Sequence, residues 1–269
     1  MERLQAAIER ARERRQVDAP GPARTRKPAS HPEPELWAAI PQLDINERKL
    51  LRNRVFMLQQ GRESAYFDKL RTKILQQCRD HGWKRVVITS ATAGCGKTTL
   101  SCNLAASFTR QRDRRVIVHE LDMRRPEMGR IFGYRPETGI ADVLDGTGKF
   151  EDTAVRISDN VILAMNNGPH PNPSQILLRD RTPATLDEIE ARYRPDVVII
   201  DTPPLLATDD TQSLLKYVDC AIIVAAAEHT TTSEVDAVEK EIAEQTNVLG
   251  VVLNRCNYMD DDYGYGYGA

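Results

Sequence analysis

The 269-residue sequence contains no long hydrophobic run and no large excess of one charge. No apolar stretch approaches the roughly 20 residues that a membrane-spanning helix needs, and no apolar core follows Met1 as it does in a signal peptide. A formal net charge of −2 gives no general indication of nucleic-acid binding. We therefore expect a cytoplasmic protein without a nucleic-acid partner, recruited to the inner face of the cell membrane only through another protein.

Cysteine is also sparse, and its spacing excludes two common uses. The five cysteines form no CxxC pair and have no histidine at metal-ligand spacing, so neither a disulfide framework nor a zinc site is indicated. A scattered, odd-numbered set within apolar segments is typical of reduced intracellular thiols. These residues are Cys78, Cys95, Cys102, Cys220 and Cys256.

Composition divides the chain into four parts. The first is rich in arginine and patterned as a short helix, which is either a solvated end or an element that docks on a partner or a membrane surface. The second is dense in proline, which is typical of a linker. A single folded domain follows, and then a tail that alternates tyrosine with glycine. The four ranges are 1–17, 18–35, 36–257 and 258–269.

Short apolar runs that alternate with helical patterns indicate the fold class. Runs such as RVVITS and DVVIID resemble strands that are buried on both faces, and the helical segments between them indicate βαβ units with right-handed crossovers. We expect a three-layer α/β/α fold with a mainly parallel sheet. Its predicted strands are 85–90, 115–121, 160–165, 196–201, 219–226 and 248–255, and helical patterning precedes them at 47–60 and 64–78.

The stretch TSATAGCGKTTL leaves the first of these strands and enters a helix. Gly94 and Gly96 permit backbone conformations that direct N–H groups at phosphate oxygens, and the helix N-terminus adds partial positive charge. Lys97 can reach the β- and γ-phosphates, and the Thr98 hydroxyl can bind Mg²⁺. An ordinary glycine-rich turn is the alternative, but the flanking strand and helix favour a nucleoside triphosphate site. Its predicted residues are Ala93, Gly94, Cys95, Gly96, Lys97, Thr98 and Thr99.

Two acidic motifs end other predicted strands. In VVIIDTPP, Asp201 would lie at the carboxyl edge of the sheet, where a carboxylate can hold Mg²⁺-bound water or merely cap a helix. In HELDMRRP, Glu120 and Asp122 can coordinate metal or accept a hydroxyl proton, and Arg124 can hold phosphate or bridge to a neighbouring subunit. Taken alone, the second motif is better interpreted as a solvated charged turn.

Aromatic residues make up only 6% of the chain, yet half of its eight tyrosines lie in the last twelve residues. Glycine alternation in YMDDDYGYGYGA opposes helix formation and packing, so we expect these rings to be accessible. The tail is either a low-complexity end without a role or a set of phosphate acceptors on a nucleotide-binding protein. The candidate acceptors are Tyr258, Tyr263, Tyr265 and Tyr267.

In combination, these motifs resemble the bacterial tyrosine kinases (BY-kinases) of the capsular and exopolysaccharide type, which belong to the deviant P-loop ATPases. ATAGCGKT matches their Walker A motif, HELDMRRP their Walker A′, VVIIDTPP their Walker B, and the tail their tyrosine cluster, from about residue 63 onward. The resemblance implies a P-loop NTPase fold, ATP and Mg²⁺ as cofactors, and autophosphorylation in trans that controls polysaccharide synthesis or export. It also implies self-association and a membrane polysaccharide co-polymerase as activator.

The resemblance also implies roles for individual residues. Asp210 matches an acid that recurs after the family's DTPP, and Asn254 lies where related ATPases contact adenine. The implied metal ligands are Thr98, Asp122 and Asp201. The implied catalytic residues are Lys97, Glu120, Asp122, Arg124 and Asp201.

Two departures from the family pattern leave other functions open. Glu120 replaces the first aspartate of Walker A′. In the family's ExxRxxR self-association helix, Ala65 replaces the glutamate and Asp68 the first arginine, so that only Arg71 remains. A non-catalytic ATP-binding regulator is therefore one alternative. A partition- or septum-type ATPase is another, although Thr92 stands where those relatives carry a signature lysine.

Overall fold

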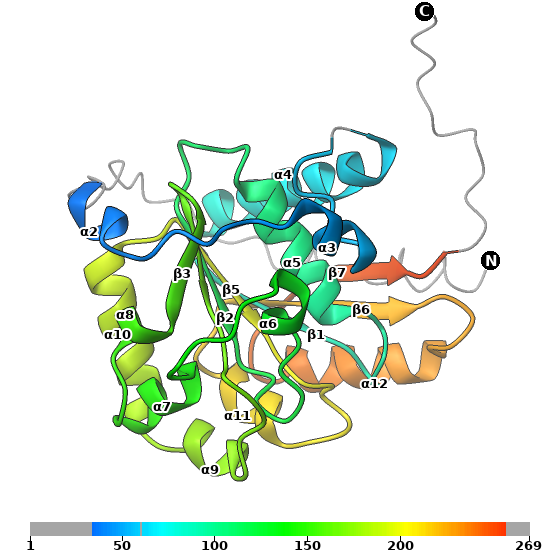
Figure 1. Ribbon diagram of the computed structural model, residues 1–269. Coiled ribbons are helices and arrows are strands. Elements are labelled where there is room, and N and C mark those ends of the chain that lie inside the picture. Colours follow the sequence, from blue (N-terminus) through cyan, green and yellow to red (C-terminus); the bar gives the residue numbers. More distant parts are fainter. Residues whose placement is uncertain (1–33, 60, 257–269) are drawn as a thin grey trace, which may run out of the picture.

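Figure 1 shows the computed structural model, which describes residues 34–59 and 61–256. The predicted N-terminal helix, most of the predicted linker and the tyrosine tail lie outside these residues. The core is a seven-stranded sheet in the order β3-β4-β2-β5-β1-β6-β7, parallel except for the pair β3 and β4. The strands are β1 (Arg85–Thr89), β2 (Val116–Glu120), β3 (Ala154–Ser158), β4 (Val161–Ala164), β5 (Val197–Asp201), β6 (Cys220–Ala226) and β7 (Asn247–Asn254).

Helices cover both faces of the sheet, which confirms the predicted three-layer fold (Figure 1). Side chains alternate between the two cores along each strand, so that Val87 packs on one face and Val86 and Ile88 on the other. The Val87 face is covered by α2 (Pro34–Ala38), α7 (Ile140–Asp145), α8 (Phe150–Thr153), α9 (Pro173–Leu177), α10 (Arg181–Tyr193), α11 (Asp210–Leu215) and α12 (Thr232–Ala243). The Val86 face is covered by α3 (Glu47–Arg52), α4 (Arg62–His81), α5 (Lys97–Phe108) and α6 (Met128–Phe132).

The six predicted strands are confirmed, but two local expectations are wrong. Strand β3 was not predicted. It is an edge strand whose sequence AVRIS carries a half-buried arginine and lacks a long apolar run. The predicted helix 47–60 ends at Arg52, and Arg54 adopts a left-handed φ of 59°. The chain then crosses α5, where Asn103 Nδ2 donates to the Arg54 carbonyl at 2.8 Å. A tertiary hydrogen bond thus competes successfully with helix continuation.

The segment before α3 binds the edge of the sheet that β3 forms. Helix α2 begins at Pro34, inside the range that composition assigns to the linker. Trp37 is buried and its indole N–H donates to the Tyr193 carbonyl at 2.9 Å, while Gln42 forms an isolated parallel bridge with Arg156 of β3. Residues 34–45 therefore belong to the folded domain. Within the described part of the chain, no helix is long and apolar enough to cross a membrane.

Candidate functional site

Three of the predicted motifs meet at the carboxyl edge of the sheet. Strand β1 lies next to β5, and β5 lies next to β2; in these pairs Ile88 is in register with Asp201, and Glu120 with Asp201. The loop after β1, the last residue of β5 and the loop after β2 consequently adjoin one another. Parallel strands with crossover helices commonly place ligand sites at this edge.

The loop between β1 and α5 has the backbone of a phosphate cradle. Gly94 has a φ of 81° and Gly96 a φ of 91°, which only glycine adopts without strain. A Cβ on Gly96 would lie 2.3 Å from Asn254 Nδ2, so a larger residue would displace that side chain. Helix α5 starts at Lys97 directly behind this loop and presents its free N–H groups to it.

Asp201 lies under the loop with both carboxylate oxygens engaged. Thr98 Oγ1 donates to Oδ2 at 2.7 Å, and Ser101 Oγ donates to Oδ1 at 2.9 Å. Complete burial raises the pKa of Asp201 to about 7, although these hydrogen bonds and the nearby Lys97 ammonium act in the opposite direction. Ser101 was not predicted as a site residue. Its position one helical turn after Lys97, on the same side of the helix, is the signal that could have identified it.

Asp122 and Arg124 both lie near the cradle but have different partners. Burial raises the pKa of Asp122, while the N–H of Arg125, which donates to Oδ1 at 3.0 Å, and the charge of Lys97 lower it. Arg124 forms a bidentate pair with the buried Asp210 at 2.7 and 2.9 Å. The same guanidinium donates to Ser174 Oγ at 3.0 Å. Arg124 is therefore held by Asp210, which was predicted by resemblance, and by Ser174, which was not.

Glu120, the last residue of β2, binds the backbone of two loops. Its carboxylate is completely buried and accepts N–H donors from Met128 at 2.6 Å and from Asn166 at 2.9 Å. Burial raises its pKa to about 8, against the opposing effect of these hydrogen bonds. None of the hydrogen bonds described for Glu120 reaches the cradle. Its geometry is that of an anchor for two loops, while its predicted catalytic role stays a prediction.

Asn254 lies beside the cradle at the end of β7. Its Nδ2 donates to the Cys95 carbonyl at 2.8 Å, so its side chain holds the loop on the side of Gly96. Thr230 adds a second contact from the loop after β6, with Oγ1 lying 3.6 Å from Cys95 Sγ. These contacts place Asn254 at the nucleotide site, while its predicted contact with adenine stays a prediction.

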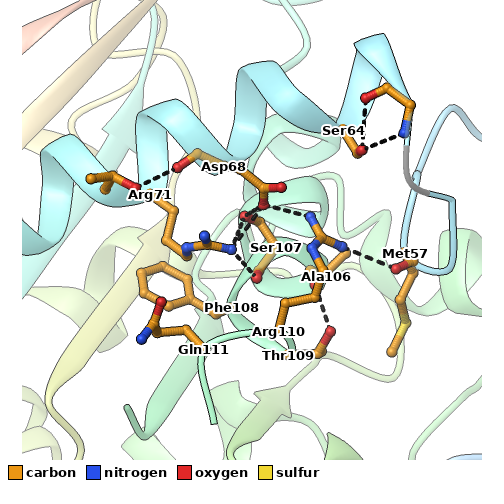
Figure 2. Close-up of polar contacts among 12 residues, drawn as sticks. Met57, Ser64, Asp68, Arg71, Ala106, Ser107, Phe108, Thr109, Arg110 and Gln111 are labelled. Carbon is orange, nitrogen blue, oxygen red and sulfur yellow. Dashed lines mark hydrogen bonds and ion pairs between the residues drawn. The ribbon is translucent and has the colours of Figure 1, made fainter. Parts of the chain in front are cut away.

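In the helix that resembles the family's self-association segment, Asp68 and Arg71 point toward the end of α5, as Figure 2 shows. Asp68 Oδ1 accepts from Arg71 Nη1 at 2.8 Å, from Arg110 Nη2 at 2.6 Å and from Ser107 Oγ at 2.5 Å. Arg71 also donates to the Ser107 carbonyl at 2.6 Å. The arginine that remains from the motif thus binds α5 of its own chain.

These features define a P-loop nucleotide-binding domain. The chain belongs to the CobQ/CobB/MinD/ParA nucleotide binding domain family, whose model matches residues 86–261. Its fold resembles the kinase domain of the Escherichia coli tyrosine kinase ETK, with 25% identity and a TM-score of 0.67 over 86% of this chain and 94% of that one. It also resembles the chimerical protein CapA2B2, with 26% identity and a TM-score of 0.68 over 81% and 94% of the two chains.

Curated relatives carry the same kinase name, so the resemblance in the sequence is confirmed. The putative tyrosine-protein kinase EpsB of Ralstonia nicotianae is 34% identical over 203 residues, which are 74% of this chain and 26% of the relative. The chain thus spans about a quarter of the length of that relative. The tyrosine-protein kinase YwqD of Bacillus subtilis is 29% identical over 82% of this chain and 93% of its own length.

Proposed function

We propose that this chain is an ATP-dependent tyrosine autokinase that phosphorylates the tail tyrosines of a second copy. The Thr98–Asp201 hydrogen bond beneath the glycine loop is the observation that carries the proposal, because it joins the residues expected to bind nucleotide and metal. The kinase names of the relatives support the same activity.

The chemistry of the side chains fits ATP with Mg²⁺. Thr98, Asp122 and Asp201 present oxygen atoms, which Mg²⁺ prefers, and Mg²⁺ sites in such enzymes are completed by the phosphates of the substrate. Among the described residues, no group of three or more His, Cys, Asp or Glu side chains could hold a metal ion alone. Bound Mg²⁺ would neutralise charge on the phosphates, and Lys97 would add to that effect.

The transfer needs one proton acceptor and one aligned hydroxyl. The tyrosine oxygen attacks the γ-phosphorus and loses its proton, while the bond from the γ-phosphorus to the β,γ-bridging oxygen breaks and ADP leaves. Both oxygens of Asp201 are already engaged by Thr98 and Ser101. We assign Asp122 as the proton acceptor, since burial raises the pKa of its carboxyl group and so increases its basicity.

The names of the relatives support a cellular role in polysaccharide synthesis or export. One of them is named a putative tyrosine-protein kinase in the cps region of Klebsiella pneumoniae. We assign this chain to polysaccharide synthesis or export, at the inner face of the membrane, with a membrane polysaccharide co-polymerase as activator. Co-purification with the cytoplasmic part of such a protein would test the assignment.

The decisive experiment is an anti-phosphotyrosine blot of the full chain with ATP and Mg²⁺, with and without the cytoplasmic end of a candidate activator. We expect a signal from the wild type and none from Lys97→Met, because the ammonium no longer reaches the phosphates. A chain with phenylalanine at all four tail tyrosines should also lose the signal. A full signal from that chain would place the acceptors elsewhere.

A non-catalytic regulator is the second candidate, and the position of Glu120 favours it. Both of its carboxylate oxygens accept backbone N–H groups, from Met128 and from Asn166. A regulator would bind ATP without forming phosphotyrosine under any condition, including with the activator present. Measured ATP binding together with a blank blot would select this function.

A further inference from the structure

A cavity opens at the carboxyl edge of the sheet, between the loops that follow β2 and β4. Its volume is about 480 Å³, and its wall includes Lys49, Arg130, Tyr134, Arg135 and Asn166. We call it the basic cavity, because three of these residues are cations and none of the lining residues is acidic. Arg130 and Arg135 are exposed, so their guanidinium groups are accessible to a ligand.

The cations of the basic cavity are poorly neutralised within the described part of the chain. Arg130 pairs with Glu127 only at 3.5 Å, with 65% of its side chain exposed. Arg135 donates to the Asn167 carbonyl at 2.9 Å and, like Lys49, makes no ion pair in residues 34–59 and 61–256. Three cations without strong partners in one cavity favour an anionic ligand with several charges.

The basic cavity is rigidly joined to the catalytic edge through Glu120. The Glu120 carboxylate binds the N–H of Met128 and the N–H of Asn166, and Asn166 Nδ2 donates to the Glu120 carbonyl at 2.7 Å. Asp122 lies four residues before Pro126, which also lines the cavity. A ligand bound in the cavity therefore lies one loop away from the proposed proton acceptor.

We infer that the basic cavity binds Asp260, Asp261 and Asp262 in the tail of a second copy of this chain. This inference rests on the proposed function and names how that function selects its acceptor. The three carboxylates complement the three cations, and they directly precede Tyr263. Their binding would deliver the following tyrosines to the catalytic edge.

A second copy is the occupant that the proposed function implies, because phosphoryl transfer there occurs between two chains. The sheet order places β6, β1, β5 and β2 between β7, after which the described chain ends, and β4, whose following loop lines the cavity. These five strand spacings of about 4.8 Å amount to about 24 Å. The chain's own aspartates would have to cross most of the sheet to reach their own cavity, whereas the tail of a second copy is not restricted in this way.

The test uses the full chain with a silent tail and a synthetic acceptor peptide of residues 257–269. The silent tail carries Tyr→Phe at positions 258, 263, 265 and 267 and Asp→Asn at 260, 261 and 262. In that background, Arg130→Gln with Arg135→Gln should raise the peptide KM about fivefold and leave kcat unchanged. The reason is that the two arginines would bind the peptide equally well in the ground state and in the transition state. Arg130→Lys with Arg135→Lys should keep the low KM, since charge is retained.

Two controls make the effect specific. Arg112→Gln removes an exposed cation at the opposite edge of the sheet and should leave KM unchanged. A peptide with asparagine at positions 260–262 should raise KM about as much as the double Arg→Gln variant, with no further rise when the two are combined. An unchanged KM in the double variant would overturn the docking site while leaving the kinase activity established.

A binding measurement separates this inference from the proposed function. Fluorescence anisotropy of the labelled peptide requires no phosphoryl transfer, so it reports docking even when every blot is blank. Weaker binding to the Arg130→Gln, Arg135→Gln chain would support the cavity, and equal binding would overturn it. For the wild-type chain, phosphorylation per molecule should increase with protein concentration. A rate independent of concentration would show that each chain uses its own tail and would overturn the second-copy assignment.

Discussion

His119 is a buried histidine in β2 whose two ring nitrogens have no hydrogen-bond partner among residues 34–59 and 61–256. Its ring lies 6.0 Å from that of Phe150 in an edge-on arrangement, within the apolar core on one face of the sheet. Burial, with a smaller effect of the Arg85 charge, lowers its pKa to about 3. The folded protein therefore keeps this ring neutral at every pH above that value.

This residue makes the stability of the domain depend on pH. The unfolded state binds a proton below about pH 6.5 and the folded state does not, so stability falls as pH decreases from 6.5 towards 3. We expect the free energy of unfolding of the wild type to fall by about 2 kcal/mol from pH 7.5 to pH 5 because of His119, and we expect His119→Leu to abolish this fall. Urea unfolding at both values measures it. His229→Gln, at an exposed histidine, is the control; an equal pH dependence in His119→Leu and wild type would contradict the assignment.

At the scale of elements, α5 is the helix that connects the phosphate cradle to the packing of the sheet and α4. It begins at the phosphate cradle, and almost every residue in it is buried because the sheet lies on one side and α4 on the other. Its far end is joined to α4 by Asp68, which accepts from Ser107 of α5, from Arg110 two residues beyond α5, and from Arg71 of α4 itself (Figure 2). One carboxylate thus fixes the position of two helices.

Removing that carboxylate should loosen α4 without touching the nucleotide site. Asp68→Ala leaves two guanidinium groups and a hydroxyl without their common acceptor, and we expect a loss of about 2 kcal/mol in the free energy of unfolding. Chemical denaturation measures this loss. Asp80→Ala, at an exposed position of the same helix, should change stability by less than about 0.5 kcal/mol. Equal effects of the two substitutions would argue against the network.

At the scale of the whole molecule, nucleotide binding connects segments that are far apart in the chain. The loop after β1 contacts Asn254 at the end of β7, and Asp201 at the end of β5 contacts Thr98 and Ser101 of α5. A ligand bound here contacts several crossovers at once. It therefore stabilises the folded domain as a unit and not one element alone.

Binding of ATP with Mg²⁺ should accordingly raise the melting temperature. At a ligand concentration 100 times Kd the gain is about 2.7 kcal/mol, which corresponds to roughly 5–10 °C for a domain of this size. Differential scanning fluorimetry measures the shift. Lys97→Met should abolish most of it, whereas Arg112→Gln should retain it. A full shift in Lys97→Met would show that the nucleotide binds elsewhere.

Local signals in the chain were enough to predict the fold and the centre of the site. The apolar runs specify strands that are buried on both faces, and the glycines and lysine between β1 and α5 specify the cradle by backbone geometry alone. These features depend on residues that are adjacent in sequence. The strand β3 and the early end of α3 were missed because tertiary contacts decide them.

The partners of the charged side chains were decided only by the tertiary structure. The sequence by itself determined that Glu120 and Arg71 are present, but Glu120 binds Asn166 across 46 positions of the chain, and Arg71 binds Ser107 across 36. A long polar side chain can reach several groups, and the element packed against it determines which one it binds. Glu120 therefore anchors two loops and Arg71 binds α5 of its own chain, while the catalytic role of Glu120 and the self-association of the chain stay predictions.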